Sequence, residues 1–328
     1  MPIALQVTFA LLLLVLASDA FTNAVEWIGA LFGLTRSAVG AIVAAIGSSL
    51  PETMVAFIAL VLLADPSSQA IGIGAVVGAP LMLSTVVFCL IGVGAIVLGK
   101  RHDTVEAPAR PVIVGLALFS CTFALVIGAS FAPTFAVRVG AAALALGAYA
   151  AYLIYHMRLR LLESDESPAR LRIAPRAQRP ALGLVLLQLA IATVLTAVAA
   201  RWFVASLASL SEVLAVSPLL ISILLSPVAT ELPEVLNSVI WMRRDLDDLA
   251  LGNVIGAMMF QTSFAGAIGL LATPWVLDAV SYRAAAATLA AVVFVIGWTL
   301  VRRRIEARPL ALCGLIYVGY LAAQFASR

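Results

Sequence analysis

Apolar stretches long enough to cross a bilayer recur along the whole chain, separated by short segments rich in charged residues, glycine or proline. About 20 apolar residues in an α-helix span the hydrocarbon core. Backbone groups in lipid have no water to bond, so continuous apolar stretches of this length predict helices rather than barrel strands. The pattern predicts ten transmembrane helices, at residues 3–31, 37–64, 70–98, 111–131, 134–157, 182–209, 213–242, 249–272, 279–301 and 309–326.

Composition leads to the same class of protein. Of the 328 residues, 63% are hydrophobic and 11% are charged, whereas soluble domains are about 25% charged. These values exclude a water-soluble or intrinsically disordered chain, and three cysteines exclude a disulfide scaffold. The first apolar stretch lacks a basic leader and continues past Asp19, which favours a membrane helix over a cleaved signal peptide. The predicted fold class is an all-α polytopic membrane protein.

The basic residues predict the orientation of the chain in the membrane. With ten spans, sixteen of the 20 Lys and Arg residues fall on one side, and only Arg138, Arg201, Arg283 and Arg328 fall on the other. The positive-inside rule makes the basic side cytoplasmic and places both termini outside. We therefore expect a multi-pass protein of the plasma (inner) membrane. The net charge of +3 is an orientation signal, so the expected partner is the lipid bilayer and not nucleic acid.

A polar linker divides the predicted helices into two equal sets. Residues 158–181 contain many charged residues and prolines, and we expect them to form a cytoplasmic linker between residues 1–157 and 182–328. Five helices in each half is an odd number, which predicts two inverted five-helix repeats. The triplet Leu-Pro-Glu occurs on the second helix of both halves, at residues 50–52 and 232–234.

Three glutamates lie within otherwise apolar spans. Glu52, Glu231 and Glu234 are near the middle of helices two and seven by residue count. An ionised carboxylate at that depth costs at least about 2.5–3.5 kcal/mol. No Lys or Arg lies in the interior of helices two, three, seven or eight, so protons or cations must neutralise these groups. The alternative is that the glutamates only line a hydrated vestibule.

The residues around these glutamates favour a hard cation. Pro51 and Pro233 each remove a backbone donor and free a carbonyl one turn earlier, at Gly47 and Ala229. Carbonyls, carboxylates and hydroxyls together form an oxygen-only donor set that suits Ca²⁺. No His or Cys lies in these motifs, which argues against zinc or copper. The neighbouring hydroxyls belong to Ser48, Ser49 and Thr230.

At these residues the chain resembles the calcium/cation antiporter superfamily, the sodium/calcium exchanger-like membrane proteins. That family carries two inverted repeats with Gly-Thr-Ser-Leu-Pro-Glu on the second helix, which residues 47–52 and 229–234 match, and a Gly-Asn-x-x-Gly stretch on the third, which residues 252–256 match. The resemblance implies a cation site between helices two, three, seven and eight, with Glu52 and Glu234 as central ligands. The remaining implied ligands are Glu231, Ser48, Ser49, Thr230, Asn253 and Gln261, with backbone carbonyls near Gly47, Gly78, Ala229 and Gly256.

The chain departs from the family pattern mainly in helix three. Ala75, Ala79 and Pro80 stand where the pattern has Asn, Ser and Asn, and Leu83 replaces a later polar residue. Glu231 stands where the family usually has serine. These changes weaken a multi-sodium ligand set. They favour proton coupling through Glu231 and Glu234, because two like charges close together favour a proton on one of them.

We therefore expect a secondary active antiporter that exchanges Ca²⁺ for Na⁺ or H⁺ by alternating access. Inorganic cations are its expected partners, with no cofactor beyond the transported ions. An enzyme is not expected, because no nucleophile–base set, metal–histidine site or phosphate loop occurs. One alternative is a transport-inactive exchanger-like scaffold, which the polar losses in helix three favour. Another is an antiporter for a different cation or an organic solute. The sequence does not fix the oligomeric state, and a monomer is compatible with it.

Overall fold

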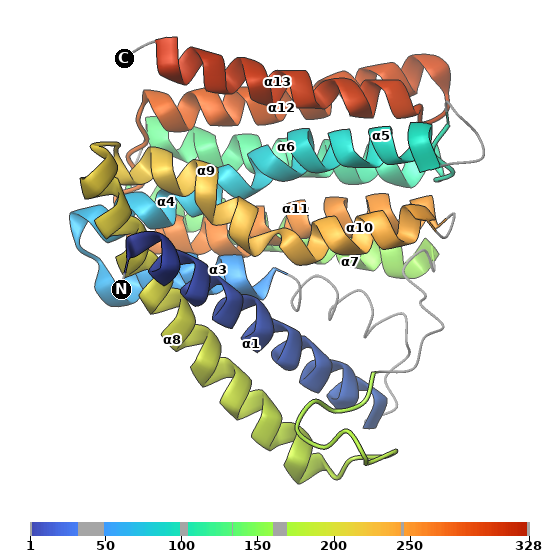
Figure 1. Cartoon of the computed structure of the whole chain (residues 1–328). Helices are drawn as coiled ribbons and strands as arrows, with labels where there is room; N and C mark the ends of the chain where they lie inside the picture. The colour runs from blue at the N-terminus through green and yellow to red at the C-terminus, as the bar shows by residue number, and fades with distance from the viewer. Residues whose placement is uncertain are drawn as a thin grey trace.

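The computed structural model describes residues 2–31, 49–98, 104–132, 134–159, 169–243 and 246–326. These residues form an all-helical structure whose single bridge pairs Thr104 with Glu306. Figure 1 shows the helices, which are α1 (Ile3–Leu31), α3 (Leu50–Phe57), η1 (Ile58–Leu63), α4 (Pro66–Met82), η2 (Leu83–Val87), α5 (Phe88–Leu98), α6 (Ala109–Gly128), η3 (Ala129–Phe131), α7 (Phe135–Leu159), α8 (Leu182–Leu214), α9 (Pro218–Thr230), α10 (Leu232–Arg243), α11 (Asp247–Ala272), α12 (Ala279–Arg302) and α13 (Ala307–Ala326).

The chain is a multi-pass membrane protein. Within the described residues, eight helical segments are long and apolar enough to cross a bilayer, and they lie at eight of the ten predicted spans. The other two predicted spans, 37–64 and 213–242, contain shorter helices. The first is represented by α3 and π-helical η1, after residues 32–48 that lie outside the described part, and the second by α9 and α10. Ten helices as inverted repeats stays a prediction.

Local capping explains where two of the central helices begin. Asp65 accepts hydrogen bonds from the backbone N–H groups of Ser67 and Ser68, both at 3.1 Å, and Pro66 follows it at the start of α4. Ser217 accepts a 3.2 Å bond from Leu220 N before Pro218 at the start of α9. A capping oxygen followed by proline satisfies the free donors of a first turn. Hydrogen bonds from Ser68 hold the pKa of Asp65 below its usual value.

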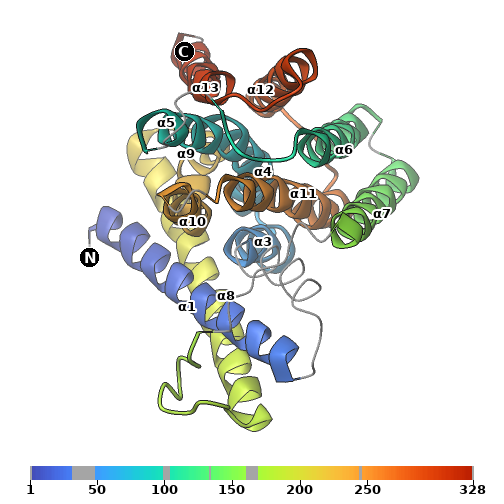
Figure 2. The same ribbon diagram turned by 90° about the vertical axis from the view of Figure 1, so that its right-hand side faces the viewer.

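The helices α4 and α11 form the centre of the molecule. Figure 2 shows them surrounded by α3, α5, α6 and α10, with α12 and α13 along one edge and α7 on another. Two glycines bring α4 against α9: a Cβ at Gly74 would lie 2.6 Å from Ser222 Cβ, and one at Gly78 would lie 2.7 Å from Ile223 O. Glycine at this four-residue spacing allows helix backbones to approach closely.

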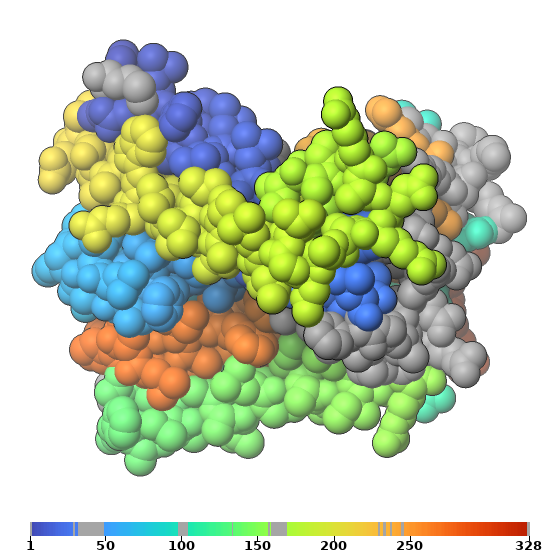
Figure 3. All heavy atoms as spheres, turned by 90° about the horizontal axis from the view of Figure 1, so that it is seen from below, coloured from blue at the N-terminus to red at the C-terminus, as the bar shows by residue number. Residues whose placement is uncertain are grey.

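The helices α1 and α8 form a tilted pair on one side of the molecule. In Figures 2 and 3 they lie next to each other on the same face, away from α12 and α13. They share an apolar cluster with parts of α3, η1, α4 and α9 that is distinct from the main core. Its fully buried members include Leu14, Ile71, Phe203 and Leu207.

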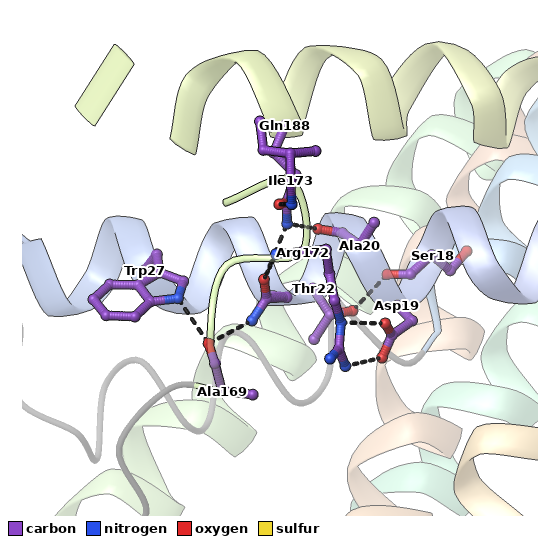
Figure 4. A network of polar contacts seen from close by, with 10 residues as sticks. Ser18, Asp19, Ala20, Thr22, Trp27, Ala169, Arg172, Ile173 and Gln188 are labelled. Carbon is purple, nitrogen blue, oxygen red and sulfur yellow. Dashed lines mark hydrogen bonds and ion pairs between the residues drawn. The ribbon is translucent and has the colours of Figure 1, made fainter. Parts of the chain in front are cut away.

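A segment of the predicted linker bonds both helices of this pair (Figure 4). The buried amide of Gln188 on α8 donates to Ala20 O at 2.8 Å and to Asn23 Oδ1 at 3.0 Å on α1. Its oxygen accepts from Ile173 N in the linker at 3.0 Å. Arg172 forms an exposed ion pair with Asp19 at 2.8 Å. The network therefore joins the first half, the linker and the second half at one end of α1 and α8.

Candidate cation-binding site

Each Leu-Pro-Glu triplet begins a helix, α3 at Leu50 and α10 at Leu232, and the residue before each triplet has the same backbone conformation. Ser49, just before the first triplet, has φ and ψ of −91° and 7°. Glu231, at the corresponding place before the second, has −90° and 4°. The next helix restarts in the same way, with Thr53 N donating to Ser49 O at 3.2 Å and Val235 N to Glu231 O at 3.0 Å. The shared proline favours a helix start at this position, because a first turn does not need the backbone donor that proline lacks.

All three glutamates are buried around the starts of α3 and α10. Glu52 is 1% exposed, and Glu231 and Glu234 are both 0% exposed. Glu52 lies in the first turn of α3 and Glu234 in the first turn of α10. A helix N-terminus carries partial positive charge, so both positions reduce the cost of a buried carboxylate. The backbone therefore offers these groups some compensation that a mid-helix position would not.

Side-chain hydrogen bonds connect the start of α3 with the residues between α9 and α10. The Thr230 hydroxyl, at the end of α9, donates to the carboxylate of Glu52 on α3. The Gln261 amide on α11 donates to Glu231 Oε1 at 2.7 Å and contacts Ser49 Oγ at 3.4 Å. Residues from both halves of the chain thus form one polar cluster around the ends of α3, α9 and α10.

The carboxylates of this cluster act on one another. The neighbouring charges that act on Glu52 and Glu231 are those of other glutamates, Glu234 foremost, and they repel. Three buried oxygens, Glu52 Oε1, Glu231 Oε2 and Gln261 Oε1, have no hydrogen-bond partner among the described residues. In that same part of the chain, no three His, Cys, Asp or Glu side chains form a closed metal site.

The structure brings together five of the residues that the sequence predicts for the site, namely Ser49, Glu52, Thr230, Glu231 and Gln261. The charge of Glu234 acts on Glu52 and Glu231. Gly47 and Ser48 lie outside the described residues.

The remaining predicted ligands have other surroundings. A Cβ at Gly78 would meet the backbone of α9, and one at Gly256 would lie 3.6 Å from Tyr152 Oη, so these two glycines border neighbouring helices. Asn253 is only partly buried and lies about 12 Å along α11 from Gln261 by helical rise. Its role, and that of the carbonyls at Gly78, Ala229 and Gly256, stays a prediction.

Three buried serines on α9 and α10 were not anticipated from the sequence. Ser222, Ser226 and Ser238 are all 2% exposed or less and lie on the same helices as Thr230 and Glu234. Ser226 lies four residues before Thr230 and Ser238 lies four residues after Glu234, and this spacing is the signal in the sequence that would have identified them.

Sequence relatives of the chain include bacterial membrane proteins. It is 24% identical over 280 residues to the inner membrane protein YrbG of Escherichia coli, covering 83% of this chain and 80% of that one. It is 35% identical over 118 residues to the putative antiporter CaxA of Alkalimonas amylolytica, covering 34% and 36% of the two chains.

Solved exchanger structures share the fold. The H⁺/Ca²⁺ exchanger CAX matches with a TM-score of 0.78 at 18% identity, covering 98% of this chain and 82% of that chain. The sodium–calcium exchanger NCX_Mj matches with a TM-score of 0.58 at 22% identity, covering 98% and 99%. The family described as sodium/calcium exchanger protein matches residues 3–158 and 184–326, which is most of the sequence. The chain therefore belongs to the sodium/calcium exchanger protein family.

Proposed function

We propose that this protein is a secondary active antiporter that exchanges Ca²⁺ for Na⁺ or H⁺ by alternating access. The observation that carries the proposal is the pair of Leu-Pro-Glu glutamates, both buried in the first turn of a helix, with Thr230 of one half bonded to Glu52 of the other. Membership of the exchanger family supports it, as do the relatives named as exchangers or antiporters.

The chemistry of the cluster favours a hard cation as cargo. Its donors are carboxylate, hydroxyl and amide oxygens, the ligand types that Ca²⁺ prefers. We propose Glu52 and Glu234 as the central ligands, completed by Glu231, Ser49, Thr230 and Gln261. Because the carboxylates are almost inaccessible to solvent, ions reach them only after a conformational change, as alternating access requires.

We further propose ten membrane helices in two inverted repeats, residues 1–157 and 182–328, joined by a cytoplasmic linker. The matching backbone at Ser49 and Glu231 supports the repeat, and the two stretches matched by the family, 3–158 and 184–326, fall on either side of the linker. The relative named an inner membrane protein supports that location. The positive-inside rule supports termini on the outer side.

Calcium flux into proteoliposomes tests the proposal directly. Purified protein is reconstituted, a Na⁺ or H⁺ gradient is imposed, and uptake of labelled Ca²⁺ is measured. We expect one of the gradients to drive uptake, and Glu52→Gln and Glu234→Gln to abolish it. Glu212→Gln, at an exposed position near the end of α8, is the matched control and should retain uptake.

Each other outcome of this experiment has a defined meaning. If neither gradient drives Ca²⁺ uptake, or if the two glutamine variants transport normally, the proposal is wrong. Flux of another cation under the same gradients would then identify a different cargo, and the absence of any flux would favour a transport-inactive scaffold. Glu231→Ser tests the coupling ion: a gain of Na⁺ dependence supports a role for Glu231 in proton coupling, and unchanged coupling contradicts it.

A further inference from the structure

A pocket lies between α6, α7 and α11, near the residues where α11 begins. Figure 2 shows α11 next to α6 and α7. The pocket measures about 400 Å³ including its open mouth, and its apolar wall is formed largely by Pro108, Pro111, Val112 and Ile255. Sites for small organic molecules have this size, with a mainly apolar lining and a few polar groups. We call this space the α11 pocket.

The α11 pocket is separate from the carboxylate cluster. Asp248 and Gly252 of α11 line the pocket, whereas Gln261 of the same helix bonds Glu231. Nine residues separate Gly252 from Gln261, which is about two and a half helical turns, so the two positions lie on opposite faces of α11. The pocket is therefore a second site and not an entrance to the first.

Contacts beside the α11 pocket hold its walls in place. Glu106 N donates to Asp247 Oδ2 at 3.0 Å, which attaches the segment before α6 to the start of α11. Further along, α6 and α11 are closely packed, because a Cβ at Gly115 would lie 2.9 Å from Ile255 Cγ2. At Gly252 an added Cβ would meet nothing within 4 Å in the described structure. The missing side chain of Gly252 therefore keeps this space open.

The carboxylate and the imidazole of the α11 pocket both present hydrogen-bond acceptors. His156 is buried against the ring of Tyr152, with the two ring centroids 4.1 Å apart. Its Nδ1 lies 3.0 Å from Tyr152 O, and because a carbonyl only accepts, Nδ1 carries the proton. In the neutral imidazole Nε2 is then an acceptor. Asp248 is exposed and adds a carboxylate, and no Lys or Arg occurs among the described residues that line the pocket.

We propose that the α11 pocket binds a small organic cation with an apolar body, of which an alkylguanidinium is the simplest. Several N–H donors of a guanidinium can bond the Asp248 carboxylate and His156 Nε2 together, while the alkyl chain packs on the proline and valine wall. A metal ion fits less well, because two such donors are too few for a closed site and no described His, Cys, Asp or Glu supplies a third. This inference goes beyond the proposed function and does not depend on it.

Nuclear magnetic resonance of the two histidines tests the proposal without any ion gradient. The chain contains only His102 and His156, so ¹⁵N-histidine labelling of the full-length protein in detergent gives two imidazoles, which His102→Gln assigns. Hexylguanidinium is added at about pH 8, where an ordinary imidazole is neutral. We expect a saturable shift of the His156 Nε2 signal. The response to 1-hexanol, which has the same chain without the charge, should be at least about tenfold weaker.

Two variants then locate the bound cation in the α11 pocket. Asp248→Asn removes the negative charge and should raise the Kd for hexylguanidinium about tenfold. Gly252→Leu fills the open space and should abolish the saturable shift. Glu212→Gln, at an exposed position outside the pocket, is the control and should leave the Kd unchanged. Thermal unfolding checks that each variant is folded, and if Gly252→Leu is not, Asp248→Asn decides the test.

Four results would overturn the proposal. The first is the absence of a saturable His156 shift with hexylguanidinium. The second is an equal shift with 1-hexanol, which would show apolar partitioning alone. The third is a shift with Zn²⁺ but not with hexylguanidinium, which would make the pocket a metal site. The fourth is an unchanged Kd in folded Asp248→Asn. None of these results bears on calcium flux, so the proposed antiporter stands or falls separately.

Discussion

The residue before each Leu-Pro-Glu triplet carries a different side chain in the two halves. Ser49 and Glu231 share a backbone conformation to within a few degrees, yet one bears a hydroxyl and the other a carboxylate. The Gln261 amide contacts both, because an N–H donor can bond either kind of oxygen. The bond to Glu231, at 2.7 Å, is the shorter of the two. Gln261 therefore orients Glu231 while leaving its second oxygen for a ligand.

The Thr230 hydroxyl should contribute directly to cation affinity. It donates to Glu52 and so fixes a carboxylate of the other half. A hydrogen bond to a charged group is worth about 1.5–3 kcal/mol, so Thr230→Val should weaken apparent Ca²⁺ affinity roughly tenfold or more. Calcium dependence of the initial exchange rate measures this. Thr196→Val on α8, whose buried hydroxyl bonds Ala192 O, is the control, and equal affinities in the two variants would contradict the assignment.

At the scale of single elements, the close packing of α4 on α9 depends on glycine. A Cβ at Gly78 would lie 2.7 Å from Ile223 O and 2.8 Å from Ile223 Cα, so the backbone of α9 would have to move. Overpacking of this kind costs about 1–3 kcal/mol. We expect Gly78→Ala to lower the unfolding temperature in detergent. Gly147→Ala, where an added Cβ meets nothing within 4 Å in the described structure, should not lower it.

The connection between α12 and α13 contains a carboxyl that should make stability depend on pH. Glu306 is buried and accepts 2.8 Å and 2.9 Å bonds from Trp298 Nε1 and Arg304 Nε. The bond from Trp298, followed by Arg304 and Arg302, holds the pKa of Glu306 below its usual value. A lowered folded-state pKa stabilises the protein at neutral pH, and this contribution is lost as pH falls from about 4.5 through the folded value.

Replacement of Glu306 isolates this contribution. Glu306→Gln should lower the unfolding temperature at pH 7, and the difference from the unaltered protein should shrink as the pH falls below about 4.5. Thermal unfolding in detergent across this pH range is the measurement. A difference that stays constant with pH would show that the charge of Glu306 is not what stabilises the connection.

Most helix positions could be predicted from the sequence, and the exceptions have local causes. The predicted helix at 279–301 agrees with α12 to within one residue, because the apolar stretch ends at Arg302. The helix α4 begins earlier than predicted because Asp65 caps it, and α8 continues to Leu214 through polar residues that suggested a loop. The break at Glu231 is harder to foresee. Pro233 indicates an interruption, but which residue leaves the helix depends on packing around it.

The residue types of the site were predictable, whereas its contacts were not. The Leu-Pro-Glu triplets and their hydroxyls identify the cluster from sequence alone. The bonds of Thr230 to Glu52 and of Gln261 to Ser49 join residues more than 170 positions apart, and only the tertiary fold brings them together. Gly78 is a separate case: the ligand carbonyl that the family pattern suggests there stays a prediction, and the structure shows that an added Cβ would meet the backbone of α9.

At the scale of the whole molecule, the linker network holds the two halves together at one end of α1 and α8. Its exposed ion pair and its buried amide should contribute very differently. An exposed pair such as Asp19–Arg172 contributes about 0–1 kcal/mol, whereas removing a buried group with three hydrogen bonds leaves its partners unsatisfied at about 1–3 kcal/mol each. Gln188 should therefore contribute more than Arg172 to the free energy of unfolding.

Paired variants test this ranking. We expect Gln188→Leu to lower the unfolding temperature clearly and Arg172→Ala to lower it little, because the buried bonds outweigh the exposed ion pair. Both variants keep the carboxylate cluster intact, so calcium binding measured at low temperature provides a check that the site survives. If Arg172→Ala is the more damaging variant, the ion pair and not the amide holds the linker in place.

The matching backbone at Ser49 and Glu231 has a thermodynamic consequence. In an exchanger built from two equivalent inverted halves, the inward-open and outward-open conformations are mirror states, and they have equal energy only when the halves carry the same side chains. Here Glu231 adds a buried carboxylate to the second half, where the first half has Ser49. The two conformations would therefore place this carboxylate in different surroundings. A free-energy difference of about 1.4 kcal/mol between the two conformations makes one of them about ten times more populated than the other. Under the proposed alternating access, Glu231 is therefore expected to contribute to which way the empty carrier faces at rest.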